Sequence, residues 1–86
     1  MAVVHIPSML RPLAGGALTV RAEGSTLRHV IEALEALHPA LRGRITDAGG
    51  LRPEVMLAIG GDEQRNLSAP VAPEDDVFIL PAIAGG

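Results

Sequence analysis

The chain has 86 residues and a formal net charge of −3; all seven of its basic residues are arginine, and it contains no cysteine. This length allows one domain, and the absence of cysteine excludes disulfides, thiolate nucleophiles and Cys-ligated metals. The scattered arginines, the single aromatic residue and the lack of an apolar run of membrane length argue against nucleic acid and membranes as partners. We therefore expect a cytoplasmic protein.

Five segments carry the apolar runs or the alternation that predict β-strands. They are residues 3–6, 17–22, 55–59, a weak strand within 63–72, and 77–80. The last of them is an unbroken apolar run, which is typical of a strand at the centre of a sheet. Residues 43–52 carry no clear pattern, and we interpret them as a long connection.

One amphipathic helix is predicted between the second and third strands. Apolar residues recur at three- and four-residue steps from Leu27, and a hydroxyl of Ser25 or Thr26 can cap the first free amides. Pro39 predicts that the helix ends near Leu37. One helix laid across one mixed sheet of four or five strands is an α+β arrangement.

The body of the chain shows no pattern typical of an active site. His5, His29 and His38 do not share a helical face at metal-ligand spacing, so we interpret them as ordinary histidines. The acidic run 74–76 lacks the alternating spacing of a calcium loop, which favours a solvated turn that steers a basic partner. The glycine pairs match no phosphate-binding motif. We therefore predict that this chain has no catalytic residue, no metal site and no bound cofactor.

The chain closes on PAIAGG, residues 81–86, directly after the last apolar strand. Glycine lacks a Cβ atom, so Gly85 and Gly86 can thread a narrow channel, and six extended residues reach about 20 Å. A carboxylate joined to AMP is a mixed anhydride, from which a sulfur donor can displace AMP and leave a nucleophilic thiocarboxylate. We expect a folded domain at residues 1–80 and a flexible tail at 81–86 whose carboxylate is the reactive group.

Two motifs give the chain a resemblance to a known family. The stretch EDDVFILPAIAGG is similar to the acidic turn, last strand and Gly-Gly tail of the ubiquitin-like sulfur carriers, the MoaD/ThiS family. The stretch IPSMLRPLAGG resembles the opening strand and glycine turn of the same family, and it looks closest to the cysteine-pathway carriers. The resemblance implies a β-grasp fold, in which the first and last strands lie side by side and parallel at the sheet centre.

The resemblance also implies a function that depends on other proteins. A MoeB/ThiF-like adenylating enzyme would use Mg-ATP on the terminal carboxylate, and Gly86 matches the glycine that becomes the thiocarboxylate. The tail residues that would thread the partner's active site are Pro81, Ala82, Ile83, Ala84 and Gly85. In the cysteine pathway a PLP-dependent cysteine synthase passes the sulfur to an activated serine, and a metallopeptidase releases the cysteine formed on the carrier. Pro7, Leu80 and Ile83 are the candidate partner surface, because of their position beside the tail.

Two other functions fit parts of this interpretation. One is a MoaD-like small subunit of molybdopterin synthase, whose partner is the large subunit of that enzyme, or a thiamin-pathway sulfur carrier. The other is a non-catalytic β-grasp interaction module. We favour a carrier that donates sulfur in biosynthesis, with cysteine as the product, and that is a protein substrate and not an enzyme.

Overall fold

The structure is a computed structural model that describes residues 1–81. Its helices are α1 (Leu27–Leu37) and two short 3-10 helices, η1 (Arg11–Ala14) and η2 (Pro39–Leu41). Its strands are β1 (Ala2–His5), β2 (Thr19–Ala22), β3 (Thr46–Asp47), β4 (Gly50–Leu51), β5 (Val55–Ile59), β6 (Asp62–Gln64) and β7 (Asp76–Pro81). No helix in this part of the chain is long and apolar enough to cross a membrane.

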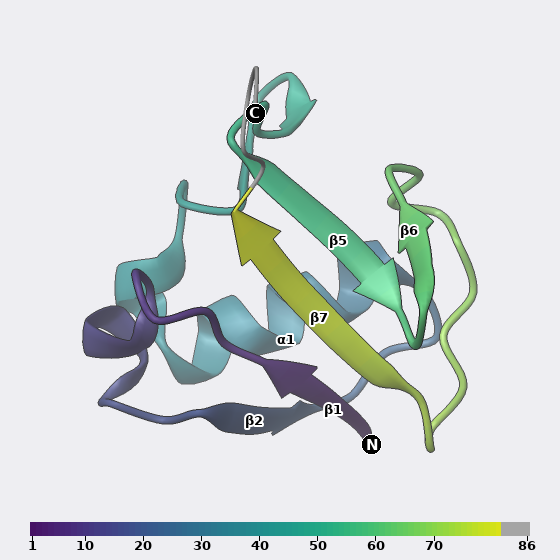
Figure 1. Ribbon diagram of the computed structural model, residues 1–86, viewed down its shortest axis with the longest axis horizontal. Coiled ribbons are helices and arrows are strands. Elements are labelled where there is room, and N and C mark those ends of the chain that lie inside the picture. The colour runs from purple at the N-terminus through teal and green to yellow at the C-terminus, as the bar shows by residue number, and fades with distance from the viewer. Residues whose placement is uncertain (82–86) are drawn as a thin grey trace.

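Five of the strands form one mixed sheet in the order β2-β1-β7-β5-β6 (Figure 1). The first and last strands of the chain, β1 and β7, pair in parallel with Val4 opposite Val77. The other pairs in this sheet are antiparallel. This arrangement confirms the predicted α+β fold of β-grasp type, including the parallel pair at its centre. The unbroken apolar sequence of β7 fits its position between β1 and β5.

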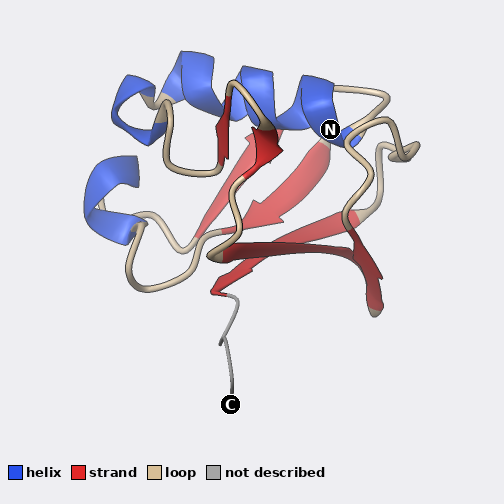
Figure 2. Ribbon diagram, turned by 90° about the horizontal axis from the view of Figure 1, so that it is seen from above, coloured by secondary structure: helices blue, strands red, loops and turns tan. Residues whose placement is uncertain are grey.

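The helix α1 crosses one face of the sheet and closes the core (Figure 2). Alternate strand residues point toward it, because side chains alternate between the two faces of a strand. The largest fully buried side chains are Ile6, Leu27, Leu34, Leu41, Ile45, Leu57, Ile79, Val4, Val30, Val55 and Val77. Every one of them is aliphatic, and no polar side chain is buried within residues 1–81. The core therefore needs no aromatic ring.

The helix begins and ends where the sequence predicts. Thr26 is the N-cap, and its Oγ1 accepts a hydrogen bond from the backbone N–H of His29 at 3.2 Å. The apolar stripe of α1 is buried against the sheet. The helix ends at Leu37, because Pro39 cannot continue it and opens η2 instead. Leu41 closes η2, in agreement with the predicted end of the helix before it.

The connection from β2 to α1 depends on Gly24. A Cβ atom at this position would lie 2.6 Å from the backbone nitrogen of Val30 and 2.8 Å from the carbonyl carbon of His29. Both distances are shorter than any van der Waals contact, so only a glycine allows the chain to pass so close to the first turn of the helix. Gly24 therefore fixes how closely α1 approaches the end of β2.

The interpretation of residues 43–52 as a long connection was wrong. This segment contains the two-stranded hairpin of β3 and β4, with Thr46 opposite Leu51. Asp47 Oδ1 accepts a hydrogen bond from the backbone N–H of Gly49 at 2.8 Å, and Gly50 has a φ of 110°. These are the features of an Asx turn followed by a residue that favours glycine. Strands of two residues are too short to give a sequence pattern.

The weak strand predicted within 63–72 is present at the start of that segment. It is β6, which has three residues and starts at Asp62. The rest of the segment is a loop that packs along the start of the helix, where the backbone N–H of Arg28 donates to the carbonyl of Leu67 at 2.9 Å. β1 is shifted by one residue from the predicted 3–6, since it begins at Ala2 and ends at His5, and β2 begins at Thr19, two residues later than predicted.

Candidate functional site

The end of β7 leads into the part of the chain that the sequence singles out. Pro81 was predicted to begin the tail and is the last residue of β7, opposite Val55 in β5. Leu80 lies opposite Met56. The other predicted tail residues, Ala82, Ile83, Ala84 and Gly85, and the predicted thiocarboxylate site, Gly86, lie outside the described residues. The structure therefore fixes the place where the chain leaves the sheet and the surfaces around it.

The first of these surfaces is the face of the sheet that α1 does not cover, which we call the open face. Its residues alternate with core residues along three neighbouring strands. They are Val3, His5, Met56, Ala58, Asp76, Phe78 and Leu80. Phe78 lies opposite Ala58 as Leu80 does opposite Met56, so the apolar side chains of β5 and β7 adjoin one another. The result is a partly exposed apolar patch that extends to the end of β7.

A stacked pair of rings stands at the centre of the open face. The rings of His5 and Phe78 lie with their centroids 4.2 Å apart and their planes 15° from parallel. His5 Nε2 also lies 3.0 Å from Asp76 Oδ1, and both side chains are partly exposed. His5 was interpreted from the sequence as an ordinary histidine, and this contact could not be foreseen because it joins residues that are 71 positions apart. Only the register of β1 on β7 brings them together.

The two body residues predicted as a partner surface lie toward the same end of the sheet. Leu80 is half-buried on the open face, one residue before the end of β7. Pro7 is half-buried just beyond β1, and its carbonyl accepts hydrogen bonds from the backbone N–H groups of Leu10 and Arg11 at 2.9 and 3.2 Å. Pro7 thus starts the turn into η1, whereas Leu80 presents its side chain directly beside the chain exit. Their role in partner binding stays a prediction.

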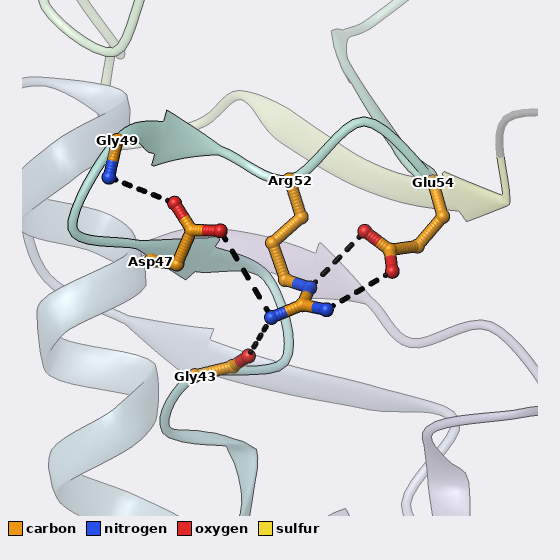
Figure 3. Close-up of polar contacts among 5 residues, drawn as sticks. All are labelled: Gly43, Asp47, Gly49, Arg52 and Glu54. Atoms are coloured by element: carbon orange, nitrogen blue, oxygen red, sulfur yellow. Dashed lines mark hydrogen bonds and ion pairs between the residues drawn. The ribbon is translucent and has the colours of Figure 1, made fainter.

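A polar network centred on Arg52 holds the segment that precedes β5 (Figure 3). The Nε and Nη2 atoms of Arg52 donate to the two carboxylate oxygens of Glu54, each at 3.1 Å, and Nη1 donates to the carbonyl of Gly43 at 3.0 Å. Asp47 Oδ2 lies 4.0 Å from Nη1. Because β5 begins directly after Glu54, this network positions the strand that pairs with Pro81.

The contact between Arg52 and Glu54 shifts the pKa of both groups. The hydrogen bond from Arg52 lowers the pKa of the Glu54 carboxyl below its ordinary value of 4.5. The hydrogen bond to Glu54 raises the pKa of the Arg52 guanidinium. Both directions mean that the ion pair favours the charged form of each partner. Sequence reasoning missed this network, and the only signal for it was an arginine and a glutamate two residues apart.

The other candidate residues of the sequence stay apart in the structure. His29 lies in the first turn of α1, and His38 follows its last residue. In the acidic run, Asp75 Oδ2 accepts a hydrogen bond from the backbone N–H of Ala72 at 2.8 Å, which closes a turn before β7. Gly15 has a φ of 66° and ends η1. Over residues 1–81, no three histidine or acidic side chains come together as metal ligands would.

Comparison with known proteins identifies the family. The ThiS family model matches residues 4–86, a span that includes the whole of both motifs noted in the sequence. The chain belongs to the ThiS family. It is thus a ubiquitin-like sulfur carrier of the MoaD/ThiS type, and the family resemblance read from the sequence is confirmed.

Curated relatives of this ThiS-family chain include the sulfur carrier protein CysO of Mycobacterium tuberculosis (strain ATCC 25618 / H37Rv) and of Mycobacterium bovis (strain ATCC BAA-935 / AF2122/97). Each is 39% identical over 89 residues, which cover 96% of this chain and 96% of the relative. The predicted likeness to the cysteine-pathway branch is confirmed, since these relatives carry the name CysO. The chain is therefore similar to CysO over nearly its full length.

Solved structures give the same result for the fold of this ThiS-family chain. The CysO chain in the BexX/CysO complex of Amycolatopsis orientalis has a TM-score of 0.91, with 30% identity and full coverage of both chains. Mycobacterium tuberculosis CysO also has a TM-score of 0.91, with 36% identity over 96% of this chain and 100% of that one. SAMP1 of Haloferax volcanii has a TM-score of 0.83, with 26% identity over 99% and 98% of the two chains.

Proposed function

We propose that a MoeB/ThiF-like enzyme adenylates the terminal carboxylate of Gly86, and that the product is converted to a thiocarboxylate that donates sulfur for cysteine biosynthesis. In this proposal the chain is a protein substrate, and the catalytic groups belong to its partners. Mg-ATP binds to the adenylating partner and not to this chain. The reactions take place in the cytoplasm.

The proposed chemistry has two steps. The carboxylate first attacks the α-phosphate of ATP, which forms an acyl-adenylate and releases pyrophosphate. A donor of sulfide-level sulfur (HS⁻) then attacks the acyl carbon, the C–O bond to AMP breaks so that AMP leaves with the electron pair, and loss of the sulfur-bound proton leaves the thiocarboxylate. The chain itself offers no cysteine and no lysine side chain that could capture the activated glycine.

The observation that carries the proposal is the match to CysO sulfur carriers over 96% of both sequences. The family match also extends through residue 86, so the proposed reactive glycine lies within the part of the chain that resembles the family. These likenesses favour the cysteine-pathway carrier over the MoaD-like subunit and over an interaction module.

The open face supports the proposal because it offers a docking surface at the chain exit. A partner that binds residues 82–86 in one conformation must offset about 1–2 kcal/mol of backbone entropy for each residue. Contacts with the apolar patch of β5 and β7 supply such binding energy, since burying a leucine side chain contributes about 1.5–3 kcal/mol. Leu80 lies at the edge of this patch, next to the last described residue.

Partners after adenylation follow from the same likeness. We propose that a PLP-dependent cysteine synthase uses the thiocarboxylate to convert an activated serine, and that a metallopeptidase releases the cysteine left on the carrier. The complex of Amycolatopsis orientalis CysO with BexX supports a mechanism in which a carrier of this kind works through bound protein partners.

The test is ATP–pyrophosphate exchange with a MoeB/ThiF-like protein from the same genome. The full chain should stimulate exchange, and the chain without Gly86 should not, although it should unfold at the same temperature. If the two chains gave equal exchange, or if the full chain gave none, the proposed function would be wrong.

A second assay separates the cysteine pathway from the alternatives. The chain carrying a thiocarboxylate is mixed with the PLP-dependent synthase and an activated serine, or with the large subunit of molybdopterin synthase. We expect consumption of the thiocarboxylate only in the first mixture. A stable complex and turnover only in the second would instead assign the chain to molybdopterin synthesis.

A further inference from the structure

A cleft of about 350 Å³ lies at the end of the sheet where the chain leaves the fold. One wall comes from the segment around η1 and includes Met9, Leu10 and Leu13. The opposite wall comes from the segment between η2 and β5, which includes Arg44, and from Val55, the first residue of β5. The first wall is entirely apolar, and the second carries charged groups.

The cleft lies next to the chain exit. Val55, which lines the cleft, is the residue that pairs with Pro81 at the end of β7. Paired residues of neighbouring antiparallel strands lie about 5 Å apart. A partner that grips the chain beyond Pro81 therefore lies within side-chain reach of the cleft.

Both walls are held in place by hydrogen bonds within the fold. Arg11 Nε donates to the carbonyl of Ile6 at 3.0 Å and fixes the start of η1. On the other wall, Arg52 Nη1 donates to the carbonyl of Gly43, and the backbone N–H of Arg44 donates to the carbonyl of Leu41 at 3.0 Å. The cleft is thus formed before any partner binds, which lowers the entropic cost of binding.

The two arginines that line the cleft differ in whether their charge is paired. Arg52 is neutralised by Glu54 and lies 4.0 Å from Asp47 (Figure 3). Arg44 is exposed and makes no ion pair with any residue between 1 and 81. Met9, on the facing wall, is 50% exposed although it is a large apolar side chain. The cleft therefore presents an uncovered apolar surface beside one uncompensated positive charge.

We propose that this cleft is a second docking site for the adenylating partner, and that it receives a large apolar side chain of that protein with a carboxylate close beside it. The apolar group packs against Met9 and Leu13, and the carboxylate pairs with Arg44. Because the cleft adjoins the exit at Pro81, this contact fixes the direction in which the chain enters the partner. The inference rests on the proposed function and adds to it the chemistry of the partner's surface.

The test is the steady-state kinetics of adenylation by the MoeB/ThiF-like protein, with the carrier as the varied substrate. Met9→Asp and Arg44→Glu should each raise KM by about tenfold, because each removes one half of the docking contact. At saturating carrier, kcat should stay unchanged, since the cleft takes no part in the chemistry. Leu37→Asp and Arg28→Glu are the matched controls, because both residues are exposed on α1. The controls should leave KM unchanged.

Competition separates docking from chemistry. Chains that lack Gly86 should inhibit adenylation of the full chain, and the same two cleft substitutions should weaken this inhibition by the same factor. If the two cleft substitutions left KM and the inhibition constant unchanged while the wild-type chain was turned over normally, the cleft would not be a docking site. The proposed function would then still hold. If the wild-type chain were neither bound nor adenylated, both proposals would fall.

Discussion

Arg52 is the residue whose contacts best explain why the chain exit has a defined place. Its guanidinium binds the carboxylate of Glu54 and the carbonyl of Gly43 at the same time, so it joins the chain just before the β3–β4 hairpin to the residue that precedes β5. An arginine suits this task because its planar group presents several donors in a fixed geometry. The position of Val55, and through it of Pro81, depends on this residue.

The lowered pKa of Glu54 makes part of this support dependent on pH. A carboxyl whose pKa is lower in the folded chain stabilises the fold above its ordinary value of 4.5, and it loses this effect as the pH falls through the lowered pKa. Glu54→Gln should therefore reduce the free energy of unfolding near neutral pH, by a difference that disappears in acid. Urea titrations of both proteins over a pH series measure this. Glu74→Gln serves as a control, and a difference that persisted in acid would contradict the assignment.

A substitution at Gly24 tests how closely α1 approaches the end of β2. Gly24→Ala should destabilise the fold by about 1–3 kcal/mol, because the added methyl group meets the backbone of His29 and Val30 at distances that force a shift. Gly61→Ala is the matched control, since a Cβ atom there would have no neighbour within 4 Å. Denaturant titration compares the two. Equal stability of both variants would show that the β2–α1 connection has more room than the structure gives it.

At the level of single residues, the sequence predicts only contacts between near neighbours. The cap of α1 by Thr26 follows from its place before an apolar-periodic segment, and it is present. The stacking of His5 on Phe78 was not predictable, because it needs the register of β1 on β7 and not merely the presence of both strands. The cleft at Arg44 was missed for the same reason, since its walls come from distant segments.

At the level of elements, predictions succeed where an apolar pattern is long enough to be recognised. The helix and the strands β5 and β7 lie where the sequence places them, because each buries a continuous set of side chains. The hairpin of β3 and β4 was not predicted, because two-residue strands are specified by turn geometry at Asp47 and Gly50 and not by periodicity. β6 was predicted only as a weak strand within 63–72, without its bounds, since its polar residues give no clear boundary.

The central strand β7 supports a prediction about the open face. Leu80→Asp should raise KM for adenylation by about tenfold or more, because it places a charge in the apolar patch that we propose to be covered by the partner. The fold should persist, since Leu80 is only half-buried. Kinetics with the adenylating protein measure the effect, and Leu37→Asp on α1 is the control. If Leu80→Asp were adenylated at the normal rate at low carrier concentration, the open face would not be part of the docking surface.

At the level of the whole molecule, the fold fixes the place at which the chain leaves the sheet. The core is aliphatic, no polar side chain within residues 1–81 is buried, and the parallel pair of β1 and β7 carries the chain to one end of the sheet. The open face and the cleft both adjoin that end. The ThiS family resemblance and the β-grasp fold were predictable from two short motifs, whereas the surfaces that would guide a partner needed the structure.

The most direct test of this account is the intact mass of the full chain after incubation with the adenylating protein, ATP and a sulfur donor. We predict the mass increase of a single oxygen-to-sulfur exchange, confined by fragmentation to Gly86 and absent from the chain that lacks this residue. A wild-type chain whose mass does not change, or an exchange located elsewhere in the chain, would contradict the central claim.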